Sequence, residues 1–464
     1  MNDTTVTIPT PKAPKLFQLG QWILDPVGYM KNNFQQYGNL FQSHVTWSSS
    51  EPLLMLSDPK AIQYMLTHDT GKQFSTPGDV NEILAPLIGW QNVILSSGKE
   101  HRRRRKLIMP PFHGERLKAY GEIIQNITQE VIAQWSTQEP FQVRSSMQKI
   151  TMRVILEAVF GLHAGERYQK IERLLSQRLD MVGNPVSSMI VFLPWLRKDF
   201  GSWSPGSRIS QLSEEIDRLL FAEIQERRSN LDPNRIDILS LLLMAQDEDG
   251  NGLSDQDLRD ELMTLLLAGH ETTATALTWA MYWLHSLPEV KEKLLAELDT
   301  VSDPEDSAQL LKLPYLSAVC NETLRIHPVA MLTFPRQVKE PMELCGYRLE
   351  PGMLLMGCIY LLHRREDLYP EPEQFRPERF LERQFSPYEF MPFGGGVRRC
   401  VGAALAEYEM KIVLGTIMKQ LDLALVNERP VKPARRGVTL GQSKPIWVKK
   451  VGARSRSKSV VTTV

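Results

Sequence analysis

The chain has 464 residues, of which 42% are hydrophobic, so it is long enough to bury a large core. Its 54 Lys and Arg residues balance its 54 Asp and Glu residues, and a net charge of zero argues against a polyanionic partner such as nucleic acid. The cysteines Cys320, Cys345, Cys358 and Cys400 form no closely spaced pair, which disfavours zinc motifs, redox pairs and a disulfide framework. We therefore expect a reducing, cytoplasmic compartment.

The elements expected in chain order form one catalytic domain over residues 1–451, followed by a disordered tail at 452–464. The N-terminal residues lack the apolar run of a signal peptide or a membrane anchor. The predicted fold class is mainly α with smaller β regions, an α+β chain. Helix-rich parts are predicted at 99–328 and 403–421, and β-rich parts near 35–60, 330–358 and 421–449.

One long helix is predicted over residues 254–287. Ser254 and Asp257 fit an N-terminal cap, and acidic residues in the first turn favour the positive end of the helix dipole. The middle of the helix is apolar except for His270, Glu271 and several threonines. Charged groups at that depth would be costly in lipid, so we expect the helix to cross a globular core rather than a membrane.

The segment Phe393–Gly402 contains the clearest chemical signal. Its glycines let the backbone approach a flat surface, and Cys400 precedes a helix start, where N–H groups favour the thiolate. A nucleophilic cysteine would need a nearby histidine and zinc would need further ligands, and the segment offers neither. A lone thiolate suits a metal held by a prosthetic group, with haem iron as the leading candidate and Arg398 as a partner for a propionate. A buried structural cysteine is the alternative.

This loop, FGGGVRRCVG, resembles the cysteine-ligand signature of the cytochrome P-450 haem-thiolate monooxygenases. Further motifs in the expected order extend the resemblance over most of the chain. It implies the cytochrome P-450 fold, in which haem b lies between the long helix and the loop. It also implies that the Cys400 thiolate is the axial ligand of the iron and that Phe393 and Gly402 line the haem site.

Glu322-Thr-Leu-Arg325 matches the ExxR helix motif of this family, and the segment around Arg379 resembles its partner. By itself, such a pair is usually an ordinary surface pair. The resemblance implies that Glu322, Arg325 and Arg379 form a buried ionic network, which fixes the cysteine loop and does no chemistry. Removing one partner would leave a buried charge unpaired.

The sequence from Ala268 to Thr272 in the long helix matches the oxygen-activation motif of the family. Ala268 would let the helix pass close to a flat cofactor. Thr272 can donate to a carbonyl one turn back and open a groove for dioxygen, while Glu271 can relay protons from solvent. The resemblance therefore assigns catalytic roles to Glu271 and Thr272. An incidental polar patch on a helix is the alternative.

The basic run at residues 101–106 would by itself be a solvated charged surface. The family commonly has a Trp-x-x-x-Arg pair here that binds a haem propionate, and this chain has His101 in place of the Trp. The resemblance implies that His101 and Arg105 bind propionates and that Arg336 is a further ligand. The arginines between His101 and Arg105 are expected to face outward and attract an acidic electron donor.

By resemblance, the substrate wall comes from the loop at 77–97, the long helix and the segment after the ExxR motif. Ordinary core packing is the alternative for each of its residues. None of them is Arg or Lys, so we expect a hydrophobic substrate such as a fatty acid, a terpenoid or an alkane-like molecule. The apolar segment 185–195 could be an access lid, a membrane contact or a plain helix contact. The expected wall residues are Leu84, Leu87, Trp90, Leu267, Ala330 and Leu332.

The expected function is insertion of one atom of O2 into this substrate. No part of the chain looks large enough for a flavin reductase, so a ferredoxin- or flavodoxin-type donor with an NAD(P)H-dependent reductase is expected to supply electrons. Glu271 with Thr272 argues against a haem-thiolate isomerase or peroxygenase and against a non-catalytic haem sensor. A cysteine hydrolase lacks a positioned base. We expect no nucleic-acid partner and no transmembrane segment, and a peripheral membrane contact stays open.

Overall fold

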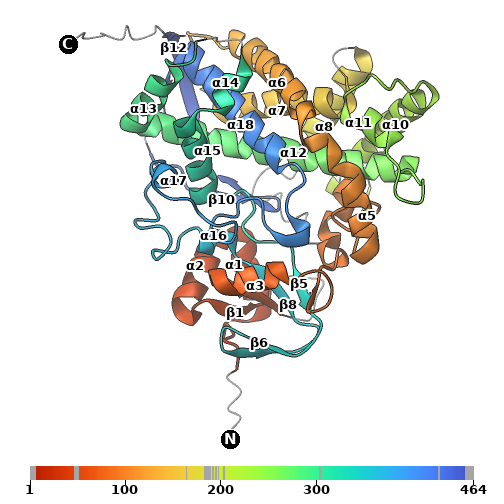
Figure 1. Ribbon diagram of the computed structural model, residues 1–464, viewed down its shortest axis with the longest axis vertical. Coiled ribbons are helices and arrows are strands. Elements are labelled where there is room, and N and C mark those ends of the chain that lie inside the picture. Colours follow the sequence, from red (N-terminus) through yellow and green to blue (C-terminus); the bar gives the residue numbers. More distant parts are fainter. Residues whose placement is uncertain are drawn as a thin grey trace, which may run out of the picture.

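A single helix, α12 (Asp255–Ser286), runs through the helical part of the computed structural model shown in Figure 1. It begins at the predicted cap, where the Ser254 side chain accepts from the Asp257 N–H and the Asp257 carboxylate accepts from the Ser254 N–H. Most of its side chains are buried, so packing on nearly all sides holds the helix in a protein core. The structure describes residues 7–45, 52–162, 165–181, 190, 193, 196, 198–201, 204–302, 306–426 and 429–454, without the side chains of 115 and 180.

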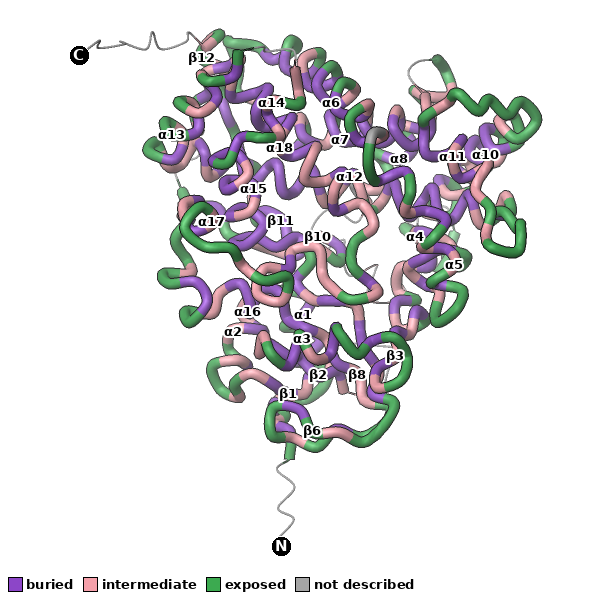
Figure 2. The backbone as a smooth tube through the Cα atoms, in the orientation of Figure 1, coloured by how far each residue is buried: buried purple, intermediate pink, exposed green. Residues whose placement is uncertain are grey.

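Helices from both halves of the chain cover α12. α7 (Val143–Phe160) lies along it, and α15 (Pro314–Ile326) and α18 (Ala403–Gln420) contact it from the later part of the chain. Their apolar side chains form one continuous core, and Figure 2 shows exposed residues gathered at the periphery. The other helices here are α4 (Ala85–Ile88), α5 (Gly98–Ile108), α6 (Glu115–Ala133), α8 (Glu166–Asp180), α10 (Pro205–Ser229), α11 (Ile238–Met244), α13 (Pro288–Leu298) and α14 (Ser307–Leu311), with the 3-10 turns η1 (Asp79–Leu84) and η2 (Pro110–Phe112).

The largest sheet has the strand order β1-β2-β8-β5-β3 and lies in the lower part of Figure 1. The β-like runs expected near 35–60 and 330–358 meet in it, because β2 and β8 pair in parallel and their neighbours pair antiparallel. A separate hairpin follows β5. The strands are β1 (Leu40–Ser43), β2 (Leu53–Leu56), β3 (Phe74–Ser75), β5 (Arg336–Val338) and β8 (Leu354–Gly357), and the hairpin is β6 (Met342–Leu344) with β7 (Tyr347–Leu349).

Three N-terminal helices were not anticipated by the sequence prediction, which singled out only a β-rich part near 35–60 in this region. Prolines begin two of them, with Asp25 and Asp58 as N-caps that accept from the Gly28 and Ala61 N–H groups at 2.9 and 2.8 Å. A proline in the first turn loses no helical hydrogen bond, so these prolines start helices instead of breaking them. The helices are α1 (Lys15–Leu24), α2 (Pro26–Tyr37) and α3 (Pro59–Thr67), and the later short helices are α16 (Ile359–Leu362), α17 (Arg379–Glu382) and η4 (Gly396–Arg398).

The C-terminal strands form two small sheets, one of which reaches back to the start of the chain. In the hairpin β10–β11, the buried Arg435 donates to the carbonyls of Trp22 and Ile23 at 2.7 and 3.1 Å. The last strand includes Gly452 and Ala453, which corrects the expected start of the tail, and residues 455–464 lie outside the described residues. The strands are β4 (Phe141–Gln142), β9 (Leu421–Leu425) and β12 (Trp447–Ala453), in the order β4-β12-β9, and β10 (Pro433–Arg436) with β11 (Thr439–Gln442).

Helices therefore dominate and the sheets are small, as the predicted α+β class requires. Within the described ranges, no helix has an apolar stretch long enough to cross a bilayer.

Candidate active site

The cysteine loop is a tight turn that leads directly into α18. The Cys400 N–H donates to the Phe393 carbonyl at 3.0 Å and closes the turn around three glycines. Two of these have no room for a side chain, because a Cβ on Gly395 would lie 2.7 Å from Leu66 Cδ1 and one on Gly396 would lie 2.9 Å from the Leu66 carbonyl. Gly396 also has a φ of +64°. The glycines thus let the loop pack against α3, which fixes the position of Cys400.

The Cys400 side chain is surrounded by protein but not covered by it. The residue is exposed, yet burial raises the pKa of its thiol. The Gly402 N–H, Arg105 and Arg399 lower the same pKa and favour the thiolate. A sulfur in this position fits a metal ligand, because a bound iron would stabilise the thiolate that burial disfavours.

The middle of α12 has an uncovered face. Ala268 is exposed, although Leu266 before it and Thr273 after it are buried. Thr272 Oγ1 donates to the Ala268 carbonyl one turn back, which is the bond that sequence analysis expected. A small residue with nothing packed over it leaves room for a flat group against the helix. The residues present therefore fit a haem between α12 and the cysteine loop.

Cationic side chains gather beside this site. Burial and the charges of Arg398, Arg105 and Arg336 together lower the pKa of His101 to about 3. Burial also lowers the pKa of Arg105, and Cys400 opposes that effect. Within the described part of the chain, Arg105 makes no ion pair with a carboxylate. An excess of buried positive charge fits an anionic group such as the haem propionates.

Two of the predicted propionate ligands already have protein partners. Arg336 pairs with Asp69 at 2.7 Å and donates to the Gly395 carbonyl at 2.9 Å. Arg398 donates to the carbonyls of Thr76 and Val93 at 2.7 and 2.8 Å. Both arginines thus tie the cysteine loop or the adjoining strand to residues before 100. Their role toward propionates stays a prediction, since these bonds occupy much of each guanidinium.

The arginines between His101 and Arg105 do not all face outward as expected. Arg102 is exposed, but Arg104 is buried and pairs with Asp257 of α12 at 2.6 Å. The pairing is possible because α5 lies beside the start of α12, whose first turn contains acidic residues. Of these arginines, Arg102 alone stays free to attract a partner at the surface.

Glu271 has partners that sequence analysis missed. Arg144 of α7 forms an ion pair with its carboxylate, and Gln148 of the same helix donates to it at 3.2 Å. Arg144 also donates to Thr275 Oγ1 at 3.1 Å. The carboxylate is therefore held against α7. No local motif marks Arg144, because its partner lies far away in the sequence.

The predicted ionic network is present. Glu322 and Arg325 are fully buried and pair at 2.7 Å, and Arg379 donates to Glu322 at 3.1 Å. The backbone N–H of Arg376 also donates to Glu322, and Arg325 donates to the His363 carbonyl at 2.8 Å. The network therefore joins α15 to the segment that leads toward the cysteine loop, which is a structural role.

The predicted substrate wall is only partly assembled. Leu84, Leu87 and Leu267 pack in one apolar cluster, which also includes Ile94, a residue that sequence analysis did not single out. Trp90 is 65% exposed and is not part of this cluster. The other two wall residues are not part of this cluster: Ala330 is exposed, and Leu332 bridges to Cys358 and packs against a different cluster. The predicted lid at 185–195 lies outside the described residues except for 190 and 193.

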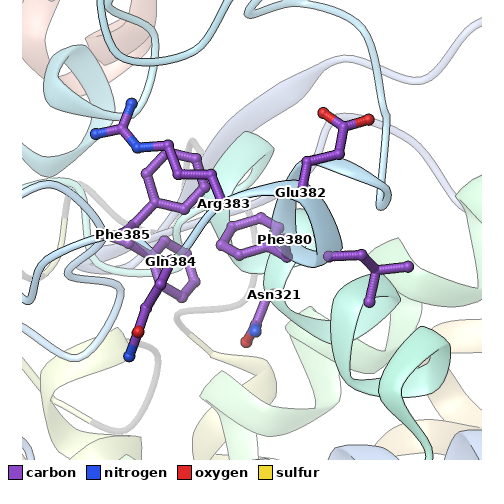
Figure 3. A pocket seen from close by; sticks show the side chains of 8 residues that line it. Asn321, Phe380, Glu382, Arg383, Gln384 and Phe385 are labelled. Carbon is purple, nitrogen blue, oxygen red and sulfur yellow. The ribbon is translucent and has the colours of Figure 1, made fainter.

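Two open cavities lie away from this site. One, of about 320 Å³, is shown in Figure 3, where Phe380, Phe385 and Arg383 gather beside α17. The other, of about 480 Å³, lies beside α3 and the β6–β7 hairpin. Neither is lined by Cys400 or Ala268, so neither belongs to the predicted haem site.

Comparison with known proteins gives concordant results. A protein-family model described as Cytochrome P450 matches residues 9–449. The chain is 35% identical over 428 residues to cytochrome P450 135B1 of Mycobacterium tuberculosis, covering 92% of this chain and 86% of that protein. It is 31% identical over 434 residues to cytochrome P450 138 of Mycobacterium bovis, covering 93% of each.

Two solved structures share the fold. The retinoic acid bound cyanobacterial CYP120A1 has a TM-score of 0.84 and 23% identity. The match covers 97% of this chain and 100% of that chain. The cytochrome P450DA haem domain has a TM-score of 0.82 and 21% identity, covering 97% and 99%. These matches confirm the fold class that the sequence predicts.

Proposed function

The chain belongs to the cytochrome P450 family of haem-dependent monooxygenases, and we propose that it inserts one oxygen atom into a hydrophobic small molecule. The substrate classes are a fatty acid, a terpenoid or an alkane-like molecule. A ferredoxin- or flavodoxin-type donor with an NAD(P)H-dependent reductase supplies the electrons. The cofactor is haem b.

One observation carries this proposal: Cys400 and Ala268 are both left uncovered by the protein, on the two elements between which the haem would lie. Cys400 would hold the iron from the side of α18, and the Gly402 N–H and Arg105 would favour its thiolate. When bound, the haem supplies the activation of dioxygen. Arg105 and His101 would hold the propionates, and Arg336 and Arg398 would be further propionate ligands.

The residues of α12 would manage protons near the site. The Thr272 hydroxyl donates to the Ala268 carbonyl, so its oxygen can accept a further hydrogen bond from water. Glu271, held by Arg144 and Gln148, can take a proton from solvent at its carboxylate and pass it on. The acid and the alcohol together favour a monooxygenase over an isomerase or a sensor.

The surface charge supports an acidic electron donor. Arg102 and Arg399 are exposed, and Arg399 stands next to Cys400 in the sequence. A partner with complementary charge would dock faster at low ionic strength. The four free cysteines fit a reducing compartment, so we propose a cytoplasmic location.

Reduced protein with bound carbon monoxide tests the proposal. The wild-type chain should show the absorption band of a thiolate-ligated haem, and Cys400→Ser should lose it. Cys345→Ser is the matched control, because Cys345 lies on the β6–β7 hairpin and should leave the band unchanged. A thiolate band that survives Cys400→Ser would contradict the ligand assignment.

A further inference from the structure

Arg178, near the end of α8, has a buried guanidinium whose donors are only partly used. The residue is 4% exposed, and its Nη2 donates to the carbonyls of Pro86 and Leu87 at 3.0 and 2.9 Å. Its Nε and Nη1 are buried and have no hydrogen-bond partner among the described residues. Two donors of a charged group are therefore unsatisfied, which is costly unless a ligand accepts from them.

The guanidinium lies beside the assembled part of the substrate wall. Leu87, whose carbonyl accepts from Arg178, packs in the apolar cluster that also contains Leu84 and Leu267. Leu267 directly precedes Ala268, the uncovered residue of α12. A molecule that lies along this wall toward Ala268 would therefore have Arg178 close to its far end. Sequence analysis found no Arg or Lys in the wall, because Arg178 comes from another helix.

The charged neighbours of Arg178 are already paired with one another. Asp217 of α10 pairs with Arg259 of α12 at 2.5 Å, and Asp260 pairs with the same arginine at 2.8 Å. Arg178 itself makes no ion pair in the part of the chain that the structure describes. Burial and the charge of Arg259 lower the pKa of Arg178 to about 10, against the opposing charge of Asp217. Arg178 therefore stays charged at neutral pH without a counter-ion of its own.

We propose that Arg178 binds the carboxylate of the substrate, so that the substrate is a long-chain carboxylic acid; this rests on the proposed function. A carboxylate can accept a charge-assisted hydrogen bond from Nε or from Nη1, which point to different sides of the guanidinium. Arg259, which lies near Arg178, precedes Ala268 by nine residues, or about 14 Å along the helix axis. A chain spans that distance and a compact molecule does not, so oxidation falls far from the acid group.

Binding has a cost that the structure makes visible. Protein covers both unused donors, so substrate entry has to move the segment around Arg178. A purely structural role for Arg178 would be to tie α8 to α4 through Nη2. That role predicts an equal loss of affinity for charged and uncharged ligands, whereas a carboxylate site predicts a selective loss.

Titrations of the purified holoenzyme separate these two roles. Tetradecanoic acid and its methyl ester are added to the wild type, to Arg178→Met and to Arg178→Lys, and binding is followed by the haem absorption shift and by calorimetry. We expect the wild type to bind the acid about ten- to a hundredfold more tightly than the ester. Arg178→Met should lose this preference and keep its affinity for the ester, and Arg178→Lys should keep part of the preference.

Arg173→Met is the matched control, because Arg173 is exposed on the same helix and its loss removes the same charge. It should bind both ligands as the wild type does. Equal weakening of acid and ester by Arg178→Met would overturn the proposal. If that variant does not fold, a wild type that binds acid and ester equally would overturn it as well.

The proposed function fails separately. Calorimetry reports acid preference whether or not the haem shows a thiolate band. A preference for the acid without that band would support the role of Arg178 and contradict the monooxygenase. The band without a preference for the acid would support the monooxygenase and contradict the role of Arg178.

Discussion

Thr272 is the residue at which an observed hydrogen bond coincides with a proposed catalytic role. Its hydroxyl bonds to the carbonyl of Ala268, the exposed residue in the middle of α12. Thr272→Ala removes the hydroxyl that would order water beside bound dioxygen. We expect electron use to continue, peroxide to accumulate and product formation to fall by up to about 100-fold. Product, peroxide and NAD(P)H consumption, measured in one assay, check this.

Thr278→Ala is the control for that experiment. Thr278 makes the same kind of bond, to the Ala274 carbonyl at 2.6 Å, but it is buried further along α12. The control should keep its coupling of electrons to product. Unchanged coupling in Thr272→Ala would remove the proposed role of that hydroxyl.

Residue-scale features were predictable where partners lie within one helical turn. The bond of Thr272 to Ala268 follows from back-bonding of a threonine in a helix, and the contact of Glu322 with Arg325 follows from their spacing. The pairing of Arg144 with Glu271 could not be predicted, because it depends on how α7 packs against α12. Side-chain pairs between helices require the fold to be known first.

At the scale of elements, Glu322 joins α15 to the segment before the cysteine loop. Glu322→Gln removes the only carboxylate that neutralises both Arg325 and Arg379 within the described residues. Two buried cations would then lack a counter-charge, which should cost about 3–5 kcal/mol of stability. The midpoint temperature of thermal unfolding and the haem content of the purified protein should both fall.

Glu382→Gln measures what an ordinary ion pair contributes in the same region. Glu382 pairs with Arg376 at 3.0 Å, and both side chains are exposed. The loss should be about 0–1 kcal/mol, with normal haem content. If Glu322→Gln were as mild as this control, the network would not hold the loop.

Element boundaries were predictable where a cap marks them and ambiguous where proline does. Ser254 and Asp257 identify the start of α12 because both halves of the capping box are local. Pro26 and Pro59 were not recognised as helix starts, although each begins a helix behind an aspartate cap. A proline after an Asp is compatible with either outcome, and packing against the sheet decides between them.

At the scale of the whole molecule, a buried carboxyl makes stability depend on pH. Burial alone raises the pKa of Glu409 on α18 to about 8. Between its ordinary pKa and that value, the folded chain binds a proton that the unfolded chain does not, so the free energy of unfolding falls as pH rises. The slope is about 1.4 kcal/mol per pH unit within this window.

Glu409→Gln should remove this part of the pH dependence. Relative to the wild type, the variant should gain about 3 kcal/mol when urea unfolding at pH 8 is compared with pH 5.5. Glu292→Gln is the control, because Glu292 is exposed on α13 and should change neither curve. Parallel curves for the wild type and Glu409→Gln would mean that the carboxyl is ionised in the folded protein.

The clamp between Arg435 and the carbonyls of Trp22 and Ile23 constrains how the protein can be made. On the ribosome, α1 emerges more than four hundred residues before the arginine that secures it, and β2 emerges some three hundred residues before its neighbour β8. These early segments therefore lack their C-terminal partners until much or nearly all of the chain has been translated. Chaperone demand should accordingly be greatest late in synthesis, and release of a truncated chain should yield aggregates instead of a smaller folded unit.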